Sequence, residues 1–204
     1  MGLFGFGKKS DDESEKKAGK TCPVCNKGIG KFSYNPVKDG ELCDNCAEQV
    51  KEWWSKPLTD TTVDECGKII YKQDMSDEEK QAELESVGGT KAYADIYSSI
   101  AFRYLDESFT ERTMEEYGDA VLLDCVVMLG EFGSGDRVRF YHEGEFFEGV
   151  ITECSTKDYD SFEEQCDMKM LTGEASEGQP CWLLVKTEPA EAGEKLDYDD
   201  KVFV

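Results

Sequence analysis

Four cysteines near the start of the chain have the residue type and spacing that most clearly specify chemistry. They form two Cys-x-x-Cys pairs, Cys22-Pro-Val-Cys25 and Cys43-Asp-Asn-Cys46, with 17 residues between them. Each pair brings two sulfurs close enough to share one ion, and two pairs about 15 to 20 residues apart are typical of zinc. Four protein ligands leave no position for water. The sequence therefore predicts one structural, non-catalytic Zn²⁺ ion per chain.

Two other uses of these four thiolates stay open at the level of sequence. Tetrahedral sulfur also suits iron, and the spacing does not separate iron from zinc. A thiolate near a helix N-terminus has a lowered pKa and can exchange disulfides. The alternative hypothesis is therefore a thiol-based redox switch, in which oxidation releases the zinc and exposes Trp53, Trp54 and the hairpin.

The residues around the cysteines predict the elements that position them. Glycines and a Pro-to-Gly segment between the pairs predict a hairpin, with a strand at 31–34 and a turn at 36–40. After Cys43 a helix is expected that ends before Pro57, because apolar side chains recur on one helical face: Ala47, Val50, Trp53 and Trp54. A knuckle, a hairpin and a helix in this order follow the treble-clef plan. We therefore expect a zinc module over residues 21–57.

Residues 22–46 resemble an uncharacterised bacterial N-terminal zinc module. In that family a Lys lies close behind the first cysteine pair, and a Lys-Asp-Gly run precedes the second pair. The residues that match it, besides the four cysteines, are Lys27, Gly30, Lys38, Asp39 and Gly40. Asn26 stands where the family often has Gly. The family has no established activity, so the resemblance implies zinc and a bacterial, cytosolic origin.

The composition favours protein partners over nucleic acid. The 204 residues carry 23 basic and 45 acidic side chains, for a net charge of −22. This charge lies almost entirely after residue 56, in the part of the chain that follows the cysteine pairs. Proteins that bind nucleic acids rely on a basic surface, so we expect this acidic chain to bind neither DNA nor RNA. An acidic body favours solubility and basic partners.

No apolar run approaches the roughly 18 residues that span a membrane, and residues 1–7 lack the basic start of a signal peptide. We therefore expect a cytoplasmic protein without membrane contact. Five further cysteines lie in apolar or alternating segments and have no Cys-x-x-Cys spacing. We expect them to be small buried side chains: Cys66, Cys125, Cys154, Cys166 and Cys181.

The rest of the chain predicts an α+β protein with several units. Residues 1–20 are charged and poor in apolar side chains, which predicts a disordered leader. Residues 58–117 are expected to be helical, with a capping box at Ser76 and Glu79 and a short helix at 110–117. A longer amphipathic helix is expected within this region from apolar side chains at helical spacing: Tyr93, Ile96, Tyr97, Ile100, Ala101 and Tyr104.

Residues 118–204 change to the pattern of short strands with glycine-rich turns, which predicts an antiparallel barrel or sandwich. A hairpin turn is expected at 142–145. The predicted strands are Ala120–Leu129, Arg137–Tyr141, Phe146–Cys154, Cys166–Leu171, Pro180–Val185 and Lys201–Val204.

This segment resembles the second domain of elongation factor Tu. The similar stretches are VVMLGEFGSGDRV at 126–138, residues 149–151, residues 177–186 and residues 192–196. Extra acidic residues lie between 152 and 175. The resemblance implies a translation-factor-like β-barrel and, as a third hypothesis, an RNA- or ribosome-associated factor. Residues 130–135 are not followed by the Lys and the Ser or Thr that complete a phosphate-binding loop, so no GTPase is expected.

No pattern predicts catalysis or a small-molecule substrate. His142, the single histidine, falls in the predicted turn and is expected to be solvated, and no nucleophile motif is present. The acidic clusters at 158–160 and 197–200 lack the length of an EF-hand loop. We therefore expect a non-enzymatic zinc protein that acts as a cytosolic protein-interaction module.

Overall fold

The structure is a computed structural model that describes residues 20–54, 56–101, 119–156, 174–198 and 200–204. The predicted leader spans residues 1–20, and all of it except Lys20 lies outside these residues, as do the predicted helix at 110–117 and the predicted strand at 166–171. Among the described residues, no helix has both the length and the apolar character needed to cross a membrane.

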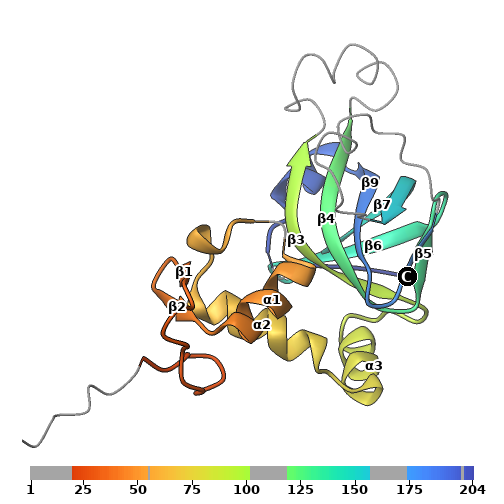
Figure 1. Ribbon diagram of the computed structural model, residues 1–204. Helices are drawn as coiled ribbons and strands as arrows, with labels where there is room; N and C mark the ends of the chain where they lie inside the picture. The colour runs from red at the N-terminus through yellow and green to blue at the C-terminus, as the bar shows by residue number, and fades with distance from the viewer. Residues whose placement is uncertain (1–19, 55, 102–118, 157–173, 199) are drawn as a thin grey trace, which may run out of the picture.

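The N-terminal part contains a small hairpin and three helices (Figure 1). Strands β1 (Asn35–Val37) and β2 (Gly40–Leu42) pair around a two-residue turn, and helix α1 (Asp44–Trp53) follows directly. The first strand therefore starts later than the predicted 31–34. A short 3-10 turn, η1 (Leu58–Asp60), leads to α2 (Val63–Gln73) and α3 (Asp77–Ser86).

Capping boxes begin both later helices. The Thr62 hydroxyl accepts the Glu65 N–H in α2, and Ser76 and Glu79 make the same reciprocal pair in α3, as predicted. These side chains satisfy N–H groups that the first helical turn leaves without an intrahelical partner.

The C-terminal part is a closed antiparallel barrel of six strands in the order β10-β3-β4-β9-β7-β6. The strands are β3 (Tyr93–Ala101), β4 (Ala120–Leu129), β6 (Arg137–His142), β7 (Glu145–Thr156), β9 (Pro180–Glu188) and β10 (Lys201–Phe203). Strands β5 (Glu131–Gly133) and β8 (Glu174–Ser176) form a separate small sheet, and η3 (Ala190–Lys195) precedes β10. The α+β fold class with an antiparallel barrel is confirmed, and so is the hairpin at 142–145.

The predicted helix over residues 93–104 is wrong, because residues 93–101 form β3, a strand of the barrel. Ala94 and Ile96 belong to the core inside the barrel, whereas Tyr93 and Tyr97 belong to the core outside it. A strand that is buried on both faces loses the alternation of apolar and polar residues that identifies strands. A register shift between Ile96 and Ser98 moves the pattern further from a period of two.

Two hydrophobic cores meet at β3 and β4. One fills the barrel, and the other joins α1, α2 and α3 to the outer face of the barrel. The Trp54 ring lies at the centre of the second core, with ring centroids 4.9 Å from Tyr97 and 5.3 Å from Tyr198. The helices therefore attach the N-terminal part to one side of the barrel.

Four charged side chains cross this same contact between the helices and the barrel. Asp95 of β3 is fully buried and lies 3.0 Å from Lys72 Nζ of α2 and 3.0 Å from Lys201 Nζ of β10. Lys201 also contacts Glu83 of α3 at 2.6 Å. Two helices and two strands thus share one network of ion pairs.

Candidate metal centre

The first cysteine pair sits on a tight turn. Cys22 N–H donates to Lys27 O at 2.8 Å, and Asn26 N–H donates to Cys22 O at 2.9 Å. Asn26 has a φ of 59°, in the left-handed region that glycine adopts without strain. This conformation explains why the resembling family often has Gly at this position, and Asn is one of the few other residues that adopt it readily.

The second pair begins α1. Cys43 is the residue before the helix, Cys46 lies in its first turn, and Ala47 N–H donates to Cys43 O at 3.0 Å. The N-terminal end of a helix carries a partial positive charge that favours nearby thiolates. The predicted order of knuckle, hairpin and helix is therefore the order that holds the cysteines.

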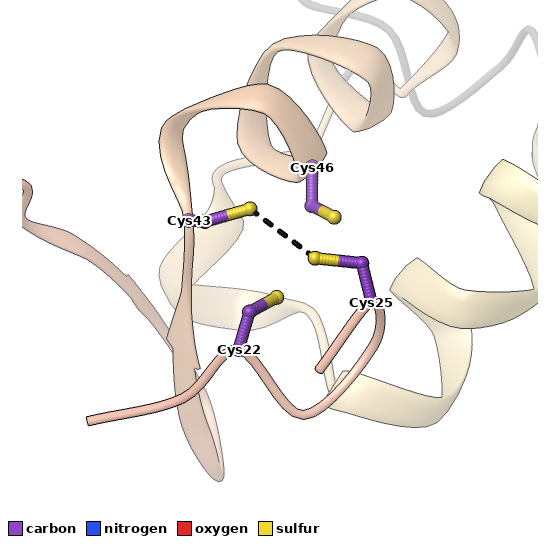
Figure 2. A group of neighbouring side chains, drawn as sticks. All are labelled: Cys22, Cys25, Cys43 and Cys46. Carbon is purple, nitrogen blue, oxygen red and sulfur yellow. Dashed lines mark hydrogen bonds between the residues drawn. The ribbon is translucent and has the colours of Figure 1, made fainter. Parts of the chain in front are cut away.

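The four sulfurs converge on one point (Figure 2). All four Sγ atoms lie within 4.8 Å of one another, and the Sγ atoms of Cys25 and Cys43 are 3.5 Å apart. A Zn–S bond of about 2.3 Å in a tetrahedral site requires sulfurs about 3.8 Å apart, so the donor set fits one tetrahedral ion. The cysteines predicted as ligands, Cys22, Cys25, Cys43 and Cys46, are thus brought together.

Burial and backbone hydrogen bonds shift the pKa values of Cys22, Cys43 and Cys46 in different directions. Burial opposes ionisation of Cys22, but hydrogen bonds from the backbone of Cys25, Cys43 and Val24 outweigh it and lower the Cys22 pKa to about 6. Burial raises the pKa of Cys43 and, together with the neighbouring thiols, that of Cys46. Four thiolates in this space therefore require the positive charge of a bound cation.

Two aspartates connect the hairpin region to the helices that follow it. The Asp44 carboxylate, at the start of α1, accepts hydrogen bonds of 2.7 Å from Ser33 Oγ and from Asn35 Nδ2. Asp39 in the hairpin turn accepts Val63 N–H at 2.7 Å, which caps the first turn of α2. These contacts were not predicted, because side chains that cap from another element leave no local sequence pattern.

The other described cysteines do not join the cluster. Four of them are fully buried, as predicted: Cys66, Cys125, Cys154 and Cys181. Cys166 lies outside the described residues. Across the described ranges, no second group of Cys, His, Asp or Glu brings three ligand atoms together.

The prediction of a solvated His142 is wrong. The residue ends β6 next to the turn, but its side chain is only 21% exposed. Its Nδ1 lies 2.8 Å from the Asp200 carboxylate, which links β6 to the residue preceding β10. Sequence reasoning missed this pair because 58 positions separate its members.

Residues 21–69 match the family model described as a domain of unknown function (DUF4428). This range includes all four cysteines, the hairpin, α1 and the first part of α2. No curated protein matches the chain.

Among solved structures, the chain is similar to the Ski7 GTPase-like domain of S. cerevisiae and to aIF5B from Aeropyrum pernix. The GTP-bound Ski7 domain is 11% identical, with a TM-score of 0.39, and the match covers 55% of this chain and 22% of that one. GDP-bound aIF5B is 8% identical, with a TM-score of 0.36, and the match covers 61% and 18%. The chain thus spans less than a quarter of either structure. The strand pairing of this chain itself defines the closed barrel.

Proposed function

We propose that this chain is a non-catalytic zinc protein whose metal centre builds a cytoplasmic protein-interaction module. The observation that carries the proposal is the convergence of four cysteine sulfurs within 4.8 Å, with Cys22, Cys43 and Cys46 buried. Four protein ligands complete the coordination of zinc and leave no position for a substrate. The ion then acts by holding the knuckle, the hairpin and α1 in place.

The order of knuckle, hairpin and helix supports a treble-clef fold for the metal module. The resemblance of residues 22–46 to a bacterial zinc module supports a bacterial origin. The six antiparallel strands support a barrel like the second domain of elongation factor Tu. The net charge of −22 of the whole chain disfavours RNA as a partner. Contact with proteins is then the property that such a barrel would retain.

Elemental analysis of the purified protein tests the metal centre. We expect one zinc per chain, no zinc in Cys46→Ser, and full zinc in the matched control Cys66→Ser, whose thiol is equally buried but outside the cluster. Iron in place of zinc would correct the metal assignment. Absence of any metal from the wild type would overturn the proposal.

The interaction role needs a separate test. Photocrosslinking in cells, with the crosslinker placed in the metal module, should give protein adducts for the zinc-loaded wild type and lose them for Cys46→Ser. A second set of proteins carries the crosslinker on the barrel instead of the metal module. Adducts from these positions are expected only if the barrel also contacts partners. Absence of adducts from every position would contradict an interaction role.

A redox switch remains the second candidate, and the 3.5 Å separation of Cys25 Sγ and Cys43 Sγ favours it. A peroxide could oxidise these two thiolates, forming one S–S bond and releasing zinc while the peroxide is reduced to water. A chromogenic chelator would report the released ion. Retention of zinc through a peroxide titration that oxidises exposed thiols would remove this candidate.

A further inference from the structure

The segment that leads into β1 presents two aromatic rings to solvent. Phe32 is 96% exposed and Tyr34 is 79% exposed, the two largest values among the exposed apolar side chains of the described residues. We call residues 27–38, which include β1, the aromatic loop. It belongs to the metal module, and the hairpin of that module, β1 and β2, lies on the side of the helices away from the barrel (Figure 1).

This exposure is imposed by the structure of the loop. Ser33 N–H donates to Gly30 O at 3.0 Å, and the Ser33 hydroxyl and the Asn35 amide both donate to Asp44 at 2.7 Å. Asp44 directly follows the ligand Cys43. The residues on either side of Tyr34 are therefore attached to the metal centre, so the loop is held before any partner arrives. Such preorganisation reduces the entropy lost on binding.

The charge around the rings is opposite to that of the molecule as a whole. Residues 20–38 contain four lysines and no Asp or Glu, whereas all 45 acidic residues lie elsewhere in the chain. Lys20 pairs with Glu41 at 2.5 Å, while Lys27, Lys31 and Lys38 are exposed. The two rings thus belong to a lysine-rich stretch of sequence that contains no acidic residue and includes the first pair of metal ligands.

We propose that the aromatic loop is the docking surface for an acidic polypeptide segment that also carries apolar side chains. This inference rests on the proposed function as an interaction module and names the chemistry of its partner. Apolar partner side chains would cover Phe32 and Tyr34, and partner carboxylates would face Lys27, Lys31 and Lys38. Aromatic anchors of this kind typically supply most of the energy of a small interface.

The extent of the charged patch favours a peptide over a nucleic acid or an anionic membrane. Asp39, Glu41 and Asp44 border the loop, and at physiological salt the interaction of exposed charges is largely screened only when they are more than about 8 Å apart. The negative charge of a nucleic-acid backbone or of an anionic membrane extends beyond the lysines, so it would be repelled by these carboxylates. A peptide needs negative charge only where it faces the lysines.

The test measures binding to a panel of short synthetic peptides that combine Asp or Glu with Leu or Phe, using the zinc-loaded full chain. We expect the best peptide to lose affinity about tenfold or more in the double variant Phe32→Ser, Tyr34→Ser, and to bind more weakly as salt rises. Tyr71→Ser is the matched control, because Tyr71 is 58% exposed on α2 but lies outside the loop, and it should bind as the wild type does. Zinc content and melting temperature verify that each variant is folded.

Equal affinity of the wild type and the double variant for every peptide would overturn the proposal. So would tighter binding of oligothymidylate or of phosphatidylserine vesicles than of any peptide, which would assign the loop to another class of partner. The crosslinking experiment distinguishes failure of the docking surface from failure of the interaction role. Adducts that persist in the double variant would reject the docking surface alone, whereas their absence from the wild type would reject the interaction role itself.

Discussion

Single residues in the metal module carry constraints that their spacing alone does not reveal. The four ligands are predictable because a Cys-x-x-Cys pair is a local pattern whose geometry barely depends on the rest of the fold. The left-handed backbone at Asn26 is equally local, but Asn occurs in many backbone conformations, so its presence does not predict a positive φ. Only the comparison with the glycine of the resembling family gives a signal there.

Substitutions at Asn26 should therefore depend on backbone preference more than on side-chain size. We expect Asn26→Gly to leave the unfolding free energy nearly unchanged. Asn26→Val should lower it by about 1 to 2 kcal/mol, because β-branched residues are strained at positive φ. Urea unfolding of the zinc-loaded protein measures both values. Equal stability of the two variants would show that the turn changes conformation.

The Cys154 thiol provides a residue-scale prediction about pH. Burial inside the barrel raises its pKa from 9.0 to about 12. Because the folded pKa is above the unfolded one, the contribution to stability is complete below pH 9 and is lost as pH rises from there toward 12. Ionisation of Cys154 in the unfolded chain should therefore lower the unfolding free energy of the wild type by about 1 kcal/mol between pH 8 and pH 10.

Cys154→Val removes the titrating group and supplies the comparison. The difference in unfolding free energy between the wild type and Cys154→Val should change by that amount between pH 8 and pH 10. Lysine titration affects both proteins equally and cancels in the difference. A pH-independent difference would mean that the thiol ionises as easily in the folded barrel as in the unfolded chain.

At the scale of elements, the sequence predicts what is local and fails where one element is covered by another. Helix α3 is predictable because its capping box lies within four residues. Strand β3 is not, because Tyr93 and Tyr97 face the helices while Ala94 and Ile96 face the barrel core. Its apolar side chains then follow tertiary burial instead of a period of two. The reading of 93–104 as a helix could be corrected only by knowing that both faces are buried.

The cap that Asp39 provides to α2 is a second contact between elements, and it connects the hairpin turn to the helix. Asp39→Ala removes the acceptor for Val63 N–H and should lower the unfolding free energy by about 1 kcal/mol. Asp60→Ala, in the exposed turn η1 just before α2, is the matched control and should change stability by less than half as much. Differential scanning calorimetry of the zinc-loaded variants measures both changes. Equal effects would mean that only net charge matters here.

At the scale of the whole molecule, the ion pairs of Asp95 join the two parts of the structure. Lys72, Asp95 and Lys201 read as ordinary surface charges in the sequence, and Asp95 and Lys201 are 106 positions apart. Nothing local marks them as partners. Their burial follows from the way the helices pack on β3 and β10, so it could not be predicted without the fold.

Removing the shared carboxylate should affect the entire protein. Asp95→Ala leaves two lysines near each other in a buried site, and we expect a loss of about 3 to 5 kcal/mol of unfolding free energy. The exposed pair of Asp64 and Lys68 is the matched control, and Asp64→Ala should cost less than about 0.5 kcal/mol. If Asp95→Ala does not fold, Asp95→Asn provides the measurable variant. A loss below 1 kcal/mol for either would show that the site is hydrated.

The position of β10 in the barrel also has a consequence for the order in which the protein acquires its structure during translation. Strand β10 lies between β3 and β6 and closes the ring of strands, so β3 has one unpaired edge until residues 201–203 have been made. At about 5 to 20 residues per second, a ribosome needs roughly 5 to 20 seconds to reach them after β3 is complete. All four metal ligands, in contrast, lie within residues 22–46. A nascent chain would therefore have its complete set of zinc ligands well before its barrel is closed. The tyrosine face of β3 could then pack on the helices early, while one edge of β3 stays unpaired until β10 has been made.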